Sequence, residues 1–188
     1  MNQRGLSGPI DRVARSDYAI NAGDGAPDST LPSLTYWPHV FAGPASLTAA
    51  TVLTNTNGWP QVPKDWTGIS WLRQHVTLSA ITDGTSNTLL YGEKYISRDL
   101  YGVGRDYGDN EMQYGGFNND NHRSTHPVWP YQQDRTNLIS VGSFGSAHSS
   151  GANFALCDGS VQTIAYSIDS QTFRYIGNRI DGQTIEIP

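Results

Sequence analysis

The hydrophobic pattern is clearest near the C-terminus, where two runs rich in apolar and β-branched residues flank an Asp-Gly pair. The runs are residues 152–157 and 160–168, and Asp158-Gly159 lies between them. This arrangement is the strongest short-range signal for a β-hairpin. The predicted connection is a type I′ turn, with positive φ at both Asp158 and Gly159.

The segment that follows the hairpin has helical periodicity. Asp169 and Ser167 are both candidate N-caps, Phe173 and Ile176 fall on one face, and Gly177 is a stop signal. The sequence therefore predicts a short C-terminal helix, which makes residues 145–188 a hairpin-and-helix unit.

Upstream of this unit the pattern is weaker. Residues 87–96, NTLLYGEKYI, form a β-rich run that predicts a strand with Leu90 and Tyr95 as candidate buried positions. Just before it, residues 78–83 are a candidate for one helical turn, with Thr77 as its cap and Gly84 as its end.

Two segments carry few periodic signals. Residues 1–45 have turn signals every few positions, so we expect a loop-rich N-terminal segment with short strands at 18–20 and 34–37. Residues 99–137 form a long polar loop, and a loop of this length is commonly functional.

These elements predict an α+β fold that is predominantly β, with an irregular antiparallel sheet. At 188 residues the chain can bury one sizeable core, so we expect a single globular domain over residues 1–188. The net charge of −5 disfavours binding to nucleic acid, which requires a basic surface. Cys157 is the single cysteine, so an internal disulfide is excluded. Because it lies in an apolar run, we expect its small side chain to be buried.

The sequence contains no apolar run as long as the ~18–20 residues of a membrane span, and its N-terminus has no hydrophobic leader segment. The expectation from these two features is a soluble chain without a leader.

Histidines and acids are the main candidates for chemistry. His148 lies ten positions before Asp158, and we expect a hydrogen bond between them that ties the stretch GSAHSSG to the hairpin turn. GSAHSSG is not the G-x-S-x-G elbow of a serine hydrolase. A metal-dependent hydrolase built on His122, His126, His148 and Asp158 is the least favoured alternative, because Pro127 disfavours a helix that would align the first two.

The polar loop also offers hard oxygen ligands. A structural calcium site is a weaker hypothesis than a solvated loop, because the spacing does not fit an EF-hand. Its candidate ligands are Asp106, Asp109, Glu111 and Asp120. Aromatic residues such as Tyr114 and Trp129 leave open a carbohydrate-binding surface, although Trp residues beside Pro or Gly also commonly pack irregular loops.

Four stretches together point to a known family. They are SDYAINAGDG near the start, ITDGTSNTLLYGEKY at residues 81–95, the H-x9-DG stretch from His148 to Gly159, and NRIDGQTI at the end. In this order they resemble the prepilin-type processing-associated H-x9-DG proteins, a bacterial family that carries domain of unknown function 1559. The signature positions are His148, Asp158, Gly159, Asp83, Gly84, Ser86, Asn87 and Glu93.

The resemblance implies a pilin-like globular head from a secreted or envelope-anchored protein related to pseudopilins of type II secretion. Full-length members begin with a basic leader, a processing site and a long apolar helix, which would provide the only attachment to the membrane. The implied partners are other envelope or pseudopilin-like subunits, or further copies of the chain. Without that helix, the sheet face it covers is expected either to self-associate or to be covered by residues 1–45.

The expected function is therefore a non-enzymatic structural or interaction role in the cell envelope, without a cofactor. The alternative is an extracellular module that binds a carbohydrate or calcium through residues 99–137.

Overall fold

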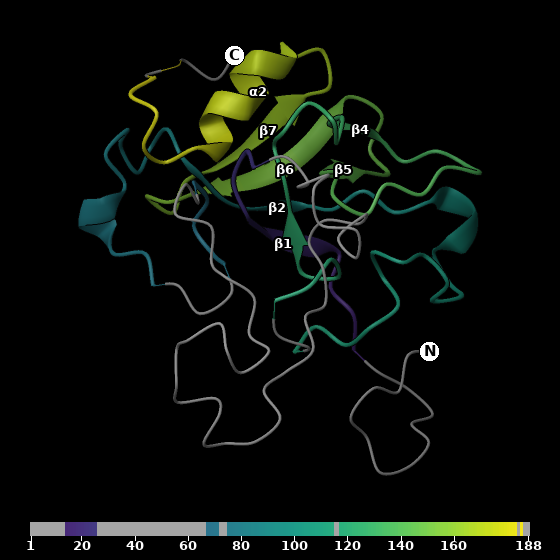
Figure 1. The fold of residues 1–188 in the computed structure, drawn as a ribbon. Helices are drawn as coiled ribbons and strands as arrows, with labels where there is room; N and C mark the ends of the chain where they lie inside the picture. The colour runs from purple at the N-terminus through teal and green to yellow at the C-terminus, as the bar shows by residue number, and fades with distance from the viewer. Residues whose placement is uncertain (1–13, 26–66, 72–74, 115–116, 184, 186–188) are drawn as a thin grey trace, which may run out of the picture.

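The computed structural model describes residues 14–25, 67–71, 75–114, 117–183 and 185. These residues form a five-stranded sheet, a two-stranded sheet and a C-terminal helix, α2 (Figure 1). The predicted α+β, mainly β class is confirmed. The strand predicted at 34–37 lies outside the described residues.

The main sheet is mixed, whereas the sequence predicted an antiparallel one. Its order is β3-β1-β2-β6-β7, and the β1–β3 pair is parallel while the other pairs are antiparallel. A parallel pair requires a long connection, and about a hundred residues separate β1 from β3. The strands are β1 (Tyr18–Asn21), β2 (Leu89–Glu93), β3 (His122–Arg123), β6 (Gly151–Leu156) and β7 (Val161–Ala165). The second sheet pairs β4 (Gln132–Gln133) with β5 (Gly145–Ser146) in parallel.

The predicted C-terminal hairpin is present as β6 and β7, but its turn differs from the prediction. Gly159 has φ +88°, whereas Asp158 is not among the described residues with positive φ. The Gly159 amide donates to the Leu156 carbonyl at 3.0 Å, and the Leu156 amide donates to the Ser160 carbonyl at 2.9 Å. The connection is thus a type I turn followed by a glycine bulge, which requires positive φ at the glycine alone.

Helix α2 (Ser170–Gly177) forms where the sequence predicted it. The Asp169 carboxylate caps its first turn by accepting the Gln171 and Thr172 amides, which decides between the two candidate caps. Phe173 and Ile176 are buried on its inner face. Because Phe173 packs against Phe144 and Phe154, the helix covers the middle of the sheet.

The core lies between α2 and the sheet. A stacked pair joins Tyr131 to Phe173, with ring centroids 4.5 Å apart. The Tyr131 hydroxyl donates to the Ile164 carbonyl at 2.5 Å and accepts the Ala152 amide at 2.6 Å, so it bridges β6 and β7. The buried apolar residues of this core are Ala19, Leu89, Phe144, Ala152, Phe154, Leu156, Ile164, Phe173 and Ile176.

Strand β2 buries Leu89, and Tyr95, two residues beyond its end, is buried as predicted, whereas Leu90, also predicted to be buried, is only partly so. The β2–β6 pairing shifts register between Leu89 and Tyr91, which moves the buried positions by one. Gly92 then faces the core, where a Cβ atom would lie 2.3 Å from the Phe154 ring.

The helical turn predicted at 78–83 is shorter than expected. A 3-10 helix, η2, spans Leu78–Ala80, and the Thr77 side chain does not cap it but lies 2.9 Å from the Ser79 hydroxyl. A second one, η3 (Arg98–Leu100), lies at the start of the predicted polar loop. Within the described ranges, no helix has the length and hydropathy that a membrane span requires.

Candidate functional site

Asn21 in the N-terminal stretch joins three segments of the fold. Its side-chain amide donates to the Leu89 and Gly177 carbonyls, each at 2.9 Å, and its side-chain oxygen accepts the Gly23 amide at 2.8 Å. The side chain is fully buried. Asn21 therefore fixes β1 against β2 and the end of α2.

Asp24, three residues later, holds the C-terminal segment from the other side. Its carboxylate accepts Arg174 Nε at 2.7 Å, Asn178 Nδ2 at 3.2 Å and the Thr67 hydroxyl at 2.6 Å. Every one of these partners belongs to a distant part of the sequence, so Asp24 acts as a structural tie.

Asp83 makes the corresponding tie within the stretch at 81–95. Its two carboxylate oxygens accept the Asp181 amide at 2.8 Å and the Gly182 amide at 3.0 Å, and the carboxylate is 8% exposed. The Asp83 carbonyl also accepts Asn87 Nδ2 at 3.0 Å. The Asp83 carboxylate thus binds the backbone of a second Asp-Gly pair, Asp181-Gly182.

The same stretch supports the hairpin. Gly84 has φ +98°, and its carbonyl accepts the Thr88 hydroxyl at 3.0 Å. The Thr85 carbonyl accepts the Asp158 amide at 3.0 Å, whereas the Ser86 side chain is exposed. We call Asn21, Asp24 and Asp83 the signature framework, because they lie within the recognised stretches and connect them.

His148 does not contact Asp158, so the predicted hydrogen bond between them is wrong. The two residues lie beyond opposite ends of β6, and the Asp158 carboxylate instead accepts the Ser160 amide at 2.9 Å and its hydroxyl at 2.7 Å. His148 Nε2 lies 3.5 Å from Glu93 Oε1. Glu93 Oε2 accepts the Asn153 amide at 2.6 Å, which holds the carboxylate in place.

The Glu93–His148 pair lies beside a pocket of about 580 Å³. The pocket brings together the end of β2, the β5–β6 connection and part of the predicted polar loop. Residues that line it include Asp17, Glu93, Tyr101, Asp134, Ser146 and His148. The Tyr101 hydroxyl donates to Asp134 at 2.5 Å, and burial raises the pKa of the Asp134 carboxyl. Glu93 and the 63%-exposed His148 side chain are the signature residues that a small molecule could reach here.

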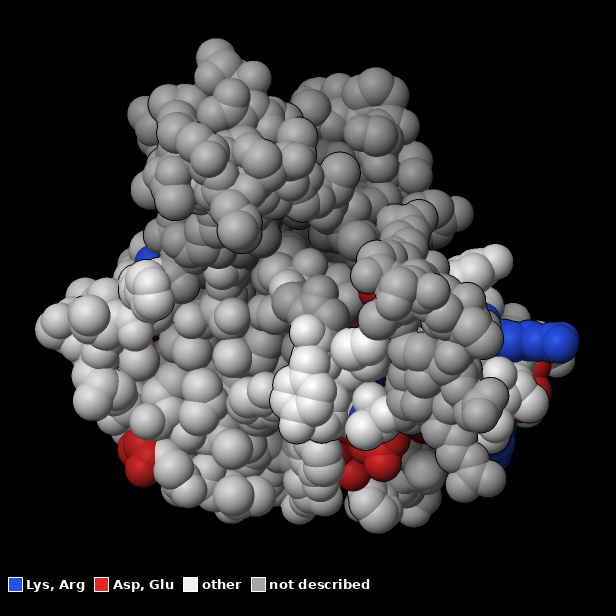
Figure 2. All heavy atoms as spheres, turned by 90° about the horizontal axis from the view of Figure 1, so that it is seen from below, with Lys and Arg blue, Asp and Glu red and all other residues white. Residues whose placement is uncertain are grey.

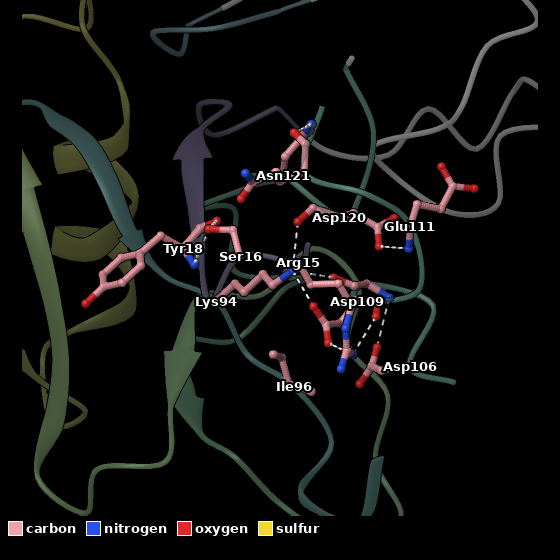
Figure 3. Close-up of polar contacts among 12 residues, drawn as sticks. Arg15, Ser16, Tyr18, Lys94, Ile96, Asp106, Asp109, Glu111, Asp120 and Asn121 are labelled. Carbon is pink, nitrogen blue, oxygen red and sulfur yellow. Dashed lines mark hydrogen bonds and ion pairs between the residues drawn. The ribbon is translucent and has the colours of Figure 1, made fainter. Parts of the chain in front are cut away.

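A second wall of the pocket contains a buried lysine, which the sequence-based reasoning missed. Lys94 Nζ donates to Asp109 Oδ1 at 2.9 Å, to the Asp120 carbonyl at 2.8 Å and to the Gly108 carbonyl at 3.1 Å. Figure 3 shows Lys94 and Arg15 both directed at Asp109, and Arg15 forms an ion pair with its other oxygen. Lys94 stands in a strand pattern beside the buried Tyr95, which is the signal that could have identified it.

Arg123 is the second buried cation, and it is completely inaccessible to solvent. Its guanidinium donates to backbone carbonyls of several segments: Ser143 at 2.8 Å, His122 at 3.0 Å and Gly108 at 3.1 Å, as well as Asn119. Arg123 therefore organises the irregular chain around it through its donors.

The candidate calcium ligands contact N–H donors and cations. Asp106 accepts the Ser97 amide at 2.7 Å and the Gly108 amide at 2.9 Å, and Asp120 Oδ1 accepts the Glu111 amide at 2.7 Å. Within the described part of the chain, no group of three or more His, Cys, Asp or Glu residues could hold a metal ion. The four predicted ligands are thus not brought together as a calcium site.

The predicted solvated loop is wrong for Asp106, Asp109 and Asp120, which lie inside the molecule, although Arg105 and Arg135 of the same segment are exposed. We call the group Lys94, Asp106, Asp109, Asp120 and Arg123 the buried charge cluster; each member is at most 3% exposed. On the face seen in Figure 2, the described acidic and basic residues form small separate groups rather than one continuous patch.

Burial changes the titration of the cluster. It lowers the pKa of Lys94 despite the Asp109 carboxylate beside it, and nearby Arg123 lowers it further. Burial also raises the pKa of Asp120 to about 6, and the Asp120 Oδ2 atom has no hydrogen-bond partner among the described residues.

Two histidines of the hydrolase alternative, His122 and His126, make different contacts within the fold. His122 is buried beside Phe117, its Nε2 lies 3.0 Å from the Ser70 hydroxyl, and burial lowers its pKa to about 3. His126 Nδ1 accepts the Val128 amide at 3.1 Å. These contacts show ordinary structural use of both rings.

A family model described as a protein of unknown function, DUF1559, matches residues 29–171, more than half of the chain. The chain belongs to the DUF1559 family. No curated protein and no solved structure matches it significantly.

In this DUF1559 protein the matched region includes Asp83, Glu93, His148 and the buried charge cluster. The framework residues Asn21 and Asp24 lie outside it, as do the framework's C-terminal partners in residues 174–182, whereas the partners Thr67 and Leu89 lie inside. The hydrogen bonds of the framework thus reach beyond residues 29–171 at both ends.

The aromatic residues of this DUF1559 protein do not form one platform in the described region. Trp71 packs on Phe117 with centroids 4.5 Å apart, and Trp129 packs over Gly142, where a Cβ atom would lie 2.5 Å from the indole. Tyr114 is 83% exposed. Trp37, Trp59 and Trp66 lie outside the described residues.

Proposed function

We propose that this protein is a non-enzymatic structural and interaction module, the globular head of a pseudopilin-like protein of the bacterial cell envelope or secretion apparatus. Membership of DUF1559 and the resemblance to prepilin-type H-x9-DG proteins support this role. Its partners would be other envelope subunits or further copies, and its membrane attachment would be an N-terminal helix as in that family.

The observation that carries the proposal is that the signature framework is used internally. Asp83 binds two backbone amides, Asn21 binds three backbone groups, and Asp24 binds side chains of the C-terminal segment. A catalytic carboxylate must reach its substrate and exchange protons with it. These three side chains are at most 8% exposed and already paired, which suits a scaffold.

Cross-linking in cells tests this role. The complete gene, expressed in its native host with a photo-reactive amino acid in place of exposed Tyr107 or Tyr114, should yield cross-links to envelope proteins and fractionate with the envelope. The matched control places the same group at buried Phe144. Recovery in the cytoplasm, with no envelope protein cross-linked from either exposed position, would overturn the proposal.

A second candidate function rests on the pocket beside Glu93. Its volume of about 580 Å³ lies in the range of small-molecule sites, and its walls combine carboxylates, hydroxyls and a histidine. This favours a small polar ligand such as a sugar. A glycan array should then give binding that Glu93→Gln weakens and that Tyr114→Ala, outside the pocket, leaves unchanged; binding lost in Tyr114→Ala alone would contradict this site.

A further inference from the structure

Strand β7 forms an edge of the main sheet and exposes most of its side chains. The described strand order ends at β7, whose other neighbour is β6. Val161 is 70% exposed, Gln162, Thr163 and Ala165 are also exposed, and only Ile164 is buried. Phe173 of α2 packs against Phe154 of the inner strand β6, and Ile164 is the β7 side chain that joins this core.

The hydrogen bonds of the hairpin determine which β7 backbone groups point outward. The Leu156 amide donates to the Ser160 carbonyl, and the Tyr166 amide donates to the Ser150 carbonyl. In an antiparallel pair, alternate residues face the partner strand, so the even-numbered residues of β7 face β6. The backbone groups of Val161, Thr163 and Ala165 therefore face away from the sheet; of these, the Ala165 carbonyl also accepts the Ile168 amide at 3.1 Å.

Edge strands normally carry features that prevent pairing with another chain, such as a charge, a proline or a bulge. Residues 160–168 contain no charged residue and no proline, and the β6–β7 register runs without a shift. At the opposite end of the sheet, β3 is only two residues long and both are buried. Of the two sheet edges, β7 is thus the one suited to accept another strand.

The segment is also complementary to itself. If two copies run antiparallel with Thr163 opposite Thr163, the outward groups of Val161 meet those of Ala165. Residues 160–168 contain no charged residue, so the two paired strands bring no like charges opposite each other. A second copy of this chain satisfies the edge by the same contacts on both sides, as a two-fold interface requires.

We infer that β7 pairs antiparallel with β7 of a second copy of this chain, about a two-fold axis at Thr163, to continue the sheet across both copies. The inference deepens the proposed interaction role, on which it rests, by naming a surface for self-association.

Charge complementation at Thr163 tests the pairing. By analytical ultracentrifugation, the wild type should rise from 20.5 kDa towards twice that mass as its concentration increases. Thr163→Lys and Thr163→Glu should each weaken dimerisation at least about tenfold, because like charges then face each other across the axis. A mixture of the two variants should restore dimers.

Leu78→Lys and Leu78→Glu provide the matched control, since Leu78 is 72% exposed and lies in η2, outside the sheet. These should dimerise like the wild type, and unchanged melting temperatures of the Thr163 variants would exclude unfolding as the cause. A wild type that stays monomeric, or Thr163 variants that dimerise normally, would overturn the pairing. Neither result would overturn the wider role, which is decided by cross-links to other envelope proteins in cells.

Discussion

The signature framework and the buried charge cluster both use buried acids, but they neutralise them differently. In the framework the two acids share no partner: Asp83 accepts two backbone amides, and Asp24 accepts donors from Arg174, Asn178 and Thr67. In the cluster, Asp109 depends on Lys94 and Arg15, and both Lys94 and Arg123 donate to the Gly108 carbonyl. Loss of one framework residue should therefore remove one tie, whereas loss of one cluster residue leaves other buried charges unpaired.

The largest expected effect is at Lys94. Lys94→Met should lower the free energy of unfolding by about 3–5 kcal/mol, because the Asp109 carboxylate and the Asp120 carbonyl lose a buried donor. Urea unfolding followed by circular dichroism measures the change. Arg105→Met, which removes an exposed cation from the same segment, should change stability by less than about 0.5 kcal/mol. If both variants lowered the free energy of unfolding equally, the buried Lys94 would contribute no more to stability than the exposed Arg105.

The next effect is at Asp83, in the framework. Asp83→Ala should cost about 3 kcal/mol, because two backbone amides lose a charged acceptor in a nearly buried position. Asp158→Ala is the matched control, since this second Asp-Gly acid is exposed and binds only its own turn. It should give the smaller loss in the same urea experiment. A larger loss for Asp158→Ala than for Asp83→Ala would mean that Asp158 contributes more to the stability of the fold.

The pH dependence of stability separates the two regions further. Burial raises the pKa of Asp120 from its ordinary value of 3.8 to about 6, so between these values the folded state binds more protons than the unfolded state. The contribution of Asp120 to stability should therefore fall as the pH rises from about 4 to about 6, by about 1–3 kcal/mol.

Asp120→Asn should remove this fall, whereas the exposed Asp17→Asn should not. Chemical unfolding at several pH values gives both profiles. A profile of Asp120→Asn that matches the wild type would show that the pKa of Asp120 is not raised in the folded state.

The parts of this fold that sequence predicts are those determined by neighbouring residues. The hairpin and α2 depend on an Asp-Gly turn, a local cap and a short apolar period, and all of these lie within about thirty residues. The buried face of β2 was misplaced at Leu90 because its register shift depends on how β6 pairs with it. Local pattern carries no information about that pairing.

The candidate site was harder to predict for the same reason. Asp106 and Asp109 have the composition of a solvated loop. Their burial depends on Lys94 and Arg15, which reach Asp109 from other segments, and on the Ser97 and Gly108 amides that bind Asp106. The partner of His148 lies 55 positions away at Glu93, whereas the sequence suggested Asp158 because it is near in the chain. The stretches shared with the family identified His148 as a signature residue, but they did not predict which residue it contacts.

The smallest expected effect is at His148, between the two regions. Its side chain is 63% exposed and its Nε2 lies 3.5 Å from Glu93 Oε1, so His148→Ala should cost at most about 1 kcal/mol in urea unfolding. Glu93→Gln, which keeps an acceptor for the Asn153 amide, should cost similarly little, and Glu93→Ala should cost more. A loss at His148 as large as that at Asp83 would mean that the histidine has an interior partner, as a bond to Asp158 would provide. A small loss at His148 would instead leave it free for a role in the pocket, and its presence in the signature would then reflect binding rather than folding.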